Sequence, residues 1–297
     1  MTSFAEESSP MNISGMLKKK TTARSIFDRI MTGVAASCVG ITLVPLFAVL
    51  IYVSLQGFRR LNLDLFTKLP PPPGLSGGGI ANAIIGTLIV VGIATAIAVP
   101  IGVLAAVYLS EFSAGNKVAR GVRFATNVLS GVPSIISGIF AYGLLVASGL
   151  IGFSAIAGGI SLAVLMLPTI IRTTDEALQI VPQDIRWAAL GVGAYNYQTV
   201  LRIVLPAAIP AILTGVTLAI ARAAGETAPL IFTALYSNFW PKGVLEPIAT
   251  LSVLVYNFAI VPFKPQQELA WAASLILVLL VLLSNISARW ATRQKQY

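Results

Sequence analysis

Two charged residues, Arg222 and Glu226, lie near the middle of the apolar run 206–236. An arginine at the centre of a membrane helix costs roughly 2.5–3.5 kcal/mol on insertion scales, so we expect Arg222 to face protein or a pathway rather than lipid. The i, i+4 spacing places both side chains on one face of a continuous helix. At 100° per residue that face also carries small or polar residues, namely Gly215, Ala219, Pro229 and Thr233.

An arginine held by a carboxylate suits the passage of an anion. The planar guanidinium fork matches a tetrahedral oxyanion, and Glu226 would hold Arg222 between passages and help the anion to leave. Arg172, at the end of the apolar run 154–171, is a candidate for a second contact on exit. Two alternatives stay open: Arg222 and Glu226 could be a neutralised pair that fixes helix packing, and Arg172 could simply snorkel at a membrane edge.

The composition is that of a membrane protein. The chain has 297 residues, of which 56% are hydrophobic and only 10% are charged, against about 25% charged residues in soluble domains. There is no histidine, and the lone Cys38 lies in an apolar run. We therefore predict no catalytic residues, no metal site and no disulfide framework. The net charge of +9 does not indicate nucleic-acid binding, because most basic residues flank apolar runs.

Runs of about 20 apolar residues are long enough to cross a bilayer as helices. We predict an all-α polytopic fold with one transmembrane domain over 30–288, between tails 1–29 and 289–297. Pro100 and Pro133 should bend their helices. The run 248–261 is short for a crossing, so we expect a surface or partly inserted helix. The six predicted spans are 30–55, 80–109, 124–150, 154–171, 206–236 and 269–288.

The basic residues predict the orientation. With both termini cytoplasmic, 14 of the 20 Lys and Arg residues lie inside, five lie outside and Arg222 lies within the membrane. This asymmetry follows the positive-inside rule. A seventh crossing by 248–261 would invert the last span and place its basic tail outside.

The polar segment 172–205 should lie on the cytoplasmic side. We expect a helix start at Thr174 with Asp175 and Glu176, a second start after Pro182, a turn at Gly191 and Gly193, and a further helix from Tyr195. Two short helices with apolar faces cannot cover each other, which favours a protein partner. The alternative is an amphipathic loop on lipid headgroups.

The spacing within this segment resembles the EAA loop of ABC importer permeases. The matching residues are Ala188, Ala189, Gly193, Ile203, Leu205 and Pro206, whereas Trp187 stands where that family has Glu. The resemblance implies a type I importer permease whose coupling loop seats two short helices in a groove of a cytoplasmic ATPase. Trp187 would alter any polar contact that the family's Glu makes there.

A longer match is more specific. The segment LAIARAAGETAPLIFTALYSNFW (218–240), with GVPSIISGIFAYG (131–143) and IRTT (171–174), resembles the phosphate ABC importer permeases, and the resemblance covers roughly residues 80–290. It implies a permease of the bacterial inner membrane that forms half of a pathway for inorganic phosphate. The implied partners are a companion permease subunit, two copies of a P-loop ATPase and an external phosphate-binding protein.

The same resemblance assigns the energy source to another chain. No GxxxxGK[ST] run occurs here, so we expect no cofactor in this chain, with ATP and Mg bound by the partner ATPase. Alternatives are a permease for another oxyanion such as sulfate or molybdate, and a proton-coupled secondary transporter that uses Glu226. A membrane-embedded hydrolase would lack a nucleophile–base pair.

Overall fold

The computed structural model describes residues 23–113 and 116–293, and its regular elements in these ranges are all helices. The chain divides into two units, residues 1–52 and 53–297. The first unit contains most of α1 (Ala23–Phe58), an apolar helix with Pro45 inside it. The predicted span 30–55 falls within α1. Most of the predicted tail 1–29 and the last four residues of the tail 289–297 lie outside the described residues.

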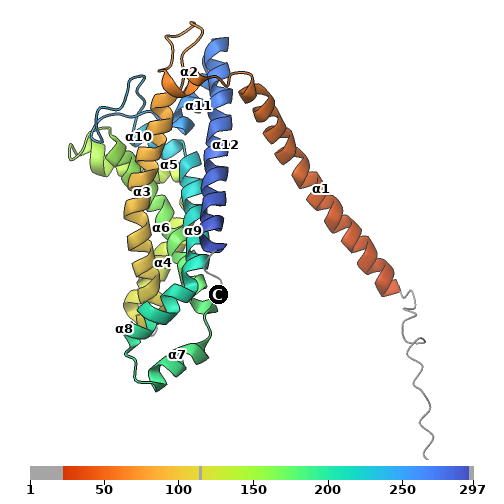
Figure 1. Cartoon of the computed structure of the whole chain (residues 1–297), viewed down its shortest axis with the longest axis vertical. Coiled ribbons are helices and arrows are strands. Elements are labelled where there is room, and N and C mark those ends of the chain that lie inside the picture. Colours follow the sequence, from red (N-terminus) through yellow and green to blue (C-terminus); the bar gives the residue numbers. More distant parts are fainter. Residues whose placement is uncertain (1–22, 114–115, 294–297) are drawn as a thin grey trace, which may run out of the picture. The chain divides into compact units, whose positions relative to one another are not determined.

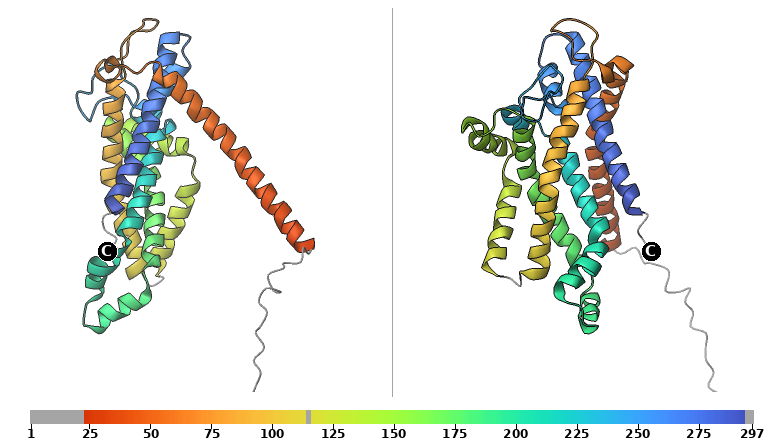
Figure 2. Two further views of the ribbon diagram at one scale, coloured as in Figure 1. Left: turned by 45° about the vertical axis from the view of Figure 1, so that its right-hand side comes forward. Right: turned by 60° about the vertical axis from the view of Figure 1, so that its left-hand side comes forward.

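The second unit is a bundle of long helices, in which α3 (Ala81–Val107) packs along α6 (Ala155–Ile180). α6 packs against α9 (Leu205–Gly225), and α9 against α12 (Lys264–Arg293), as Figures 1 and 2 show. Small buried side chains let these helices approach closely. Within the described residues, five helices are long and apolar enough to cross a membrane, and a bent pair would make six.

Short helices lie at the two ends of this bundle. At one end are α2 (Leu63–Thr67), α10 (Ala228–Thr233) and α11 (Leu251–Ala259), and at the other are α7 (Gln183–Gly191) and α8 (Asn196–Thr199) (Figure 1). The ends of the bundle therefore separate the segments that the charge pattern assigned to opposite sides of the membrane. Which end faces the cytoplasm stays a prediction from that pattern.

The predicted span 124–150 is broken rather than merely bent. α4 (Lys117–Gly131) and α5 (Ser134–Ala141) meet at an angle of 108°, and the π-helical turn η3 (Tyr142–Ala147) continues α5. Val132 is extended, because the ring of Pro133 disfavours helical geometry in the residue before it. α4 also begins seven residues before the predicted start, with the Asn116 side chain accepting the amide hydrogen of Ala119 at 2.8 Å.

The predicted helix start at Thr174 is wrong. α6 continues without interruption from the predicted span 154–171 to Ile180, so Thr174, Asp175 and Glu176 lie inside it. No glycine or proline stands between Pro168 and Pro182 to end the helix earlier. The expected starts after Pro182 and at Tyr195 do occur, as α7 and α8.

The predicted span 206–236 begins earlier and ends earlier. α8 runs through the π-helical turn η4 (Val200–Val204) into α9, so one helix extends from Asn196 to Gly225. It stops there because the ring of Pro229 would clash with the carbonyl of residue 225 if the helix continued. Glu226 is its extended C-cap. The expected helix face therefore does not reach Pro229 or Thr233, which belong to α10.

The run 248–261 forms α11, which packs against α12 and α3. Its residues Leu251, Val253, Leu254 and Phe258 are buried. A helix with this much buried surface is part of the bundle, and partial insertion of this helix into the membrane stays a prediction.

Candidate functional site

Arg222 and Glu226 remain an ion pair although Glu226 has left the helix. Arg222 Nε lies 3.5 Å from Glu226 Oε1, and the two side chains are 57% and 16% exposed. The Glu226 amide donates to the carbonyl of Ala223 at 3.2 Å, and the Glu226 carbonyl accepts the hydroxyl of Ser252 at 2.9 Å. Glu226 is thus positioned by α11 as well as by the end of α9.

Arg172 lines the same cavity as Arg222. The cavity has a volume of about 210 Å³ and is bounded by the end of α4, the break at Val132, α6 and α9. Arg172 Nε contacts Glu176 Oε1 at 3.1 Å, four residues along its helix. Each arginine contacts its acid through Nε.

Two hydroxyl groups of this cavity, those of Ser130 and Thr173, offer acceptors rather than donors. Ser130 donates its hydrogen to the carbonyl of Thr126 at 2.8 Å, and Thr173 donates to the carbonyl of Thr169 at 2.9 Å. Their lone pairs stay available, as in any hydroxyl that uses its single hydrogen. An anion here would take its hydrogen bonds from the two arginines, and an O–H group on that anion would find acceptors.

A glycine sets the distance between the two helices that carry the arginines. A Cβ on Gly215 of α9 would lie 2.5 Å from Thr173 Cβ and closer still to its hydroxyl. A larger residue would push α9 from α6 beside the cavity. Arg172 also lines a second cavity, of about 340 Å³, with Arg123, Asn127 and Gln179. It thus stands between the Arg222 cavity and the α7 end of the bundle.

The segment 183–204 forms the coupling hairpin, which we define as α7, the turn at Gly193 and α8 with η4. Gly193 has φ +89°, so it supplies the left-handed turn that the sequence predicts there. Gln198 accepts the amide hydrogen of Tyr195 at 3.0 Å and caps α8. The fold thus brings the two predicted short helices into one hairpin at the end of the bundle.

The residues that resemble the EAA loop divide between surface and interior. Trp187 is 65% exposed, Ala188, Gly193 and Pro206 are exposed, Ile203 and Leu205 are half-buried, and Ala189 is buried. Other large apolar residues of the hairpin are also exposed: Ile185, Leu190, Val192, Tyr195, Tyr197 and Leu201. The hairpin therefore presents an uncovered apolar surface, as a docking element requires.

Two long-range ion pairs at this end of the bundle were not predicted from the sequence. Arg186 of α7 binds Glu111 of the π-helical turn η2 (Tyr108–Phe112), and Arg123 of α4 binds Asp175 of α6 at 2.6 Å. The partners are 75 and 52 residues apart in sequence. No local spacing rule connects residues at such separations, so only opposite charges near the ends of apolar runs could have suggested them.

Within the described residues, no group of three or more His, Cys, Asp or Glu side chains is placed to hold a metal ion.

Comparisons with known proteins agree with these features. Residues 98–296 match the family described as binding-protein-dependent transport system inner membrane component. The phosphate transport system permease protein PstA of Yersinia pestis is 43% identical over 242 residues, covering 82% of each chain. PstA of Haemophilus influenzae is 41% identical over 273 residues, covering 92% of this chain and 96% of the relative.

Solved structures show the same fold at low identity. A chain of a bacterial alginate ABC transporter superposes with a TM-score of 0.66 at 16% identity, covering 90% of this chain and 95% of that one. A chain of the inward-facing MetNI methionine ABC transporter gives a TM-score of 0.59 at 20% identity, covering 72% and 95%. The chain belongs to the family of binding-protein-dependent transport system inner membrane components and, within it, to the phosphate transport system permeases.

Proposed function

We propose that this chain is the transmembrane permease subunit of an ATP-driven importer of inorganic phosphate, forming half of the translocation pathway in the bacterial inner membrane. The observation that carries the proposal is the cavity of about 210 Å³ that Arg172 and Arg222 share, which brings two guanidinium groups to one space. The names of the relatives, phosphate transport system permeases, support the choice of anion.

The partners follow from the family. The chain would pair with a companion permease of the PstC type, two copies of a PstB-type P-loop ATPase that bind ATP and Mg, and an external PstS-type phosphate-binding protein. The exposed apolar surface of the coupling hairpin supports docking to such an ATPase. The relatives are transport permeases, and we assign no catalytic step to this chain.

In this mechanism the anion meets Arg222 first. Its charge competes with Glu226 for the guanidinium, and the 3.5 Å ion pair re-forms when the anion leaves. Arg172 would receive the anion next, since it lines both the Arg222 cavity and the second cavity toward the hairpin. Two arginines in succession let an anion move by exchange, without crossing an apolar gap unpaired.

The cavity also favours a protonated oxyanion. Hydrogen phosphate carries an O–H donor at neutral pH, whereas sulfate carries none. Ser130 and Thr173 have given their hydrogens to backbone carbonyls and can accept that donor. A site that hydrogen-bonds a substrate hydroxyl discriminates against analogues that lack it. This is the observation that favours phosphate over sulfate or molybdate.

Radiolabelled phosphate uptake tests the proposal, in cells whose other phosphate importers have been deleted. Arg222→Ala should abolish uptake while the chain still assembles with its partners, because the anion loses its first guanidinium. Arg120→Ala is the matched control, since Arg120 is exposed on α4 outside both cavities, and it should transport normally. Full uptake by Arg222→Ala would remove Arg222 from the pathway.

Competition and energy dependence separate the alternatives. Excess unlabelled sulfate or molybdate should leave phosphate uptake unchanged, and strong competition would indicate a general oxyanion permease. Uptake that continues without the ATPase but collapses with the proton gradient would indicate a secondary transporter, in which Glu226 would carry the proton.

A further inference from the structure

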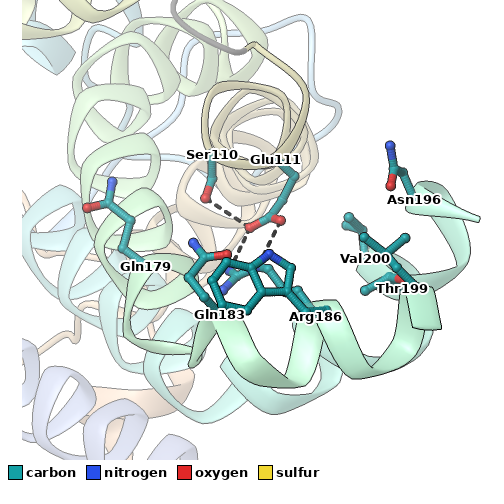
Figure 3. Close-up of a pocket in the computed structure, with 10 residues that line it drawn as sticks. Ser110, Glu111, Gln179, Gln183, Arg186, Asn196, Thr199 and Val200 are labelled. Carbon is teal, nitrogen blue, oxygen red and sulfur yellow. Dashed lines mark hydrogen bonds and ion pairs between the residues drawn. The ribbon is translucent and has the colours of Figure 1, made fainter.

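The coupling hairpin is tied to the bundle by one buried ion pair. Arg186 Nη2 lies 2.9 Å from Glu111 Oε1, and Arg186 Nε lies 3.2 Å from Glu111 Oε2, so the contact is bidentate. The side chains of Arg186 and Glu111 are only 11% and 9% exposed. Ser110 donates a further hydrogen bond to Glu111 at 3.0 Å, and Figure 3 shows these side chains pointing at one another.

Arg186 also binds the end of α6. Its Nη2 donates to the carbonyl of Leu178 at 2.8 Å, and its Nη1 donates to the carbonyl of Val181. These carbonyls belong to the C-terminal turn of α6, where a helix leaves acceptors unpaired and favours positive charge. One guanidinium therefore connects three elements: α7, the last turn of α6, and η2 at the end of α3.

Apart from this side chain, α7 is connected to its neighbouring helices through two non-helical segments. Before it, Val181 and Pro182 are extended, with ψ of 123° and 141°. After it, the chain turns through Gly193, with φ +89°. Neither segment passes a rotation of α7 on to a neighbouring helix, because helical hydrogen bonds stop at both. Of the ion pairs among the described residues, only Arg186–Glu111 links the hairpin to the rest of the bundle.

The position of Glu111 adds to this argument. It lies in the π-helical turn η2, which continues α3 for five residues. Such turns are uncommon and recur at functional sites. The other connection of the hairpin, from α8 into α9, also passes through a π-helical turn, η4. The route through Glu111 to α3 and the route through α8 to α9 thus each contain a segment with altered helical register.

We propose that the Arg186–Glu111 pair is a transmission link, which passes displacement of the coupling hairpin to α3 and α6 during the transport cycle. The inference rests on the proposed function, in which a partner ATPase moves the hairpin. Arg186 and Glu111 are positioning residues in this role and touch no substrate. The α8–α9 helix carries the motion to Arg222, and the ion pair carries it to α3 and α6, so that the three long helices move together.

The test measures coupling in the whole importer. The complex with its companion permease, ATPases and binding protein is reconstituted in proteoliposomes, and phosphate import and ATP hydrolysis are measured together. Glu111→Gln and Arg186→Gln should assemble and hydrolyse ATP, but the phosphate imported per ATP should fall at least about fivefold, the lower end of typical coupling between sites. Asp64→Asn is the matched control, because its ion pair with Lys68 lies at α2, at the other end of the bundle, and it should keep the wild-type ratio.

A cross-link gives the second arm of the test. In a Cys38→Ser background, Glu111→Cys with Arg186→Cys should uncouple the complex, and a short reducible bis-thiosulfonate reagent should restore the ratio until a reductant cleaves it. Rescue by a covalent link shows that connection, and not the charge itself, is what matters.

Three results would overturn the inference while leaving the proposed function intact. A wild-type ratio in the single variants would show that the pair transmits nothing. Loss of assembly, with import and hydrolysis falling in proportion, would show that the pair is merely structural. A cross-linked complex that assembles but stays uncoupled would show the same. A wild-type complex that imports no phosphate would instead refute the proposed function, and this inference with it.

Discussion

Replacing Gly86 with alanine should destabilise the bundle by a predictable amount. Gly86 lies on α3 where the backbone before α11 passes closest, and a Cβ there would meet the carbonyl oxygen of Ala249 within 2 Å and Ile248 Cγ1 at 2.9 Å. The first partner is backbone, which cannot rotate away. α3 and the segment before α11 would have to separate by more than 1 Å to reach ordinary contact.

The separation has two costs. Overpacking a tight core contact costs about 1–3 kcal/mol. The Leu251 amide donates to Thr87 Oγ1 at 2.8 Å beside this contact, and leaving that buried donor unpaired costs about 1–3 kcal/mol more. Alanine recovers about 0.5–1 kcal/mol of helix propensity. We therefore expect Gly86→Ala to lower the free energy of unfolding by about 1–5 kcal/mol.

Thermal unfolding of the purified full-length chain in mild detergent, followed by tryptophan fluorescence, measures this effect. Gly92→Ala is the matched control on the same helix, because Gly92 is exposed and a Cβ there would meet nothing within 4 Å. It should be neutral or slightly stabilising. Equal unfolding midpoints for Gly86→Ala and Gly92→Ala would refute the packing argument.

Three further changes test other parts of the fold. Gly193→Val should reduce the yield of co-purified ATPase, because a left-handed φ of +89° costs an L-residue about 1–2 kcal/mol. Gly191→Ala is the control, since Gly191 is in a helical position, and it should not reduce the yield. Equal ATPase yields for the two variants would contradict the docking role. Asn116→Ala should cost about 1 kcal/mol of unfolding free energy through loss of the α4 cap, and Asn116→Ser should recover most of it; no difference between the two in the same unfolding assay would argue against the cap. Asp175→Ala should lower the free energy of unfolding by about 1.5–3 kcal/mol, because the 2.6 Å bond to Arg123 is lost. In the double variant with Arg123→Met, the free energy of unfolding should fall by less than the sum of the two single effects. Additive losses would show that the pair contributes nothing.

Element type could be predicted from the sequence because membrane helices depend on a local property, the apolar run. The boundaries could not, because they depend on where backbone hydrogen bonds can continue. α6 extends to Ile180 since no residue interrupts it, whatever its polarity. Pro133 and Pro229 end helices inside apolar runs, where hydropathy alone shows no change.

The candidate site could be predicted only in part, because only one of its contacts joins residues close in sequence. Arg222 and Glu226 are four residues apart, so their contact could be foreseen, although the reason given, a continuous helix, is wrong at Glu226. The shared cavity with Arg172 depends on the packing of α6 against α9 at Gly215, a contact between distant segments. The Arg186–Glu111 pair depends on tertiary structure alone.

The unbroken helix from Asn196 to Gly225 places a limit on how such a chain can vary. One residue inserted into or deleted from α9 between the hairpin and Arg222 would rotate all that follows by about 100° and shift it by about 1.5 Å. Arg222 would then point away from its cavity, although no side chain of the site had changed. Single side chains along this helix can be substituted, but the number of its residues cannot change. A chimaera that receives the hairpin of another permease, to engage a foreign ATPase, must therefore keep the residue count between hairpin and cavity unchanged.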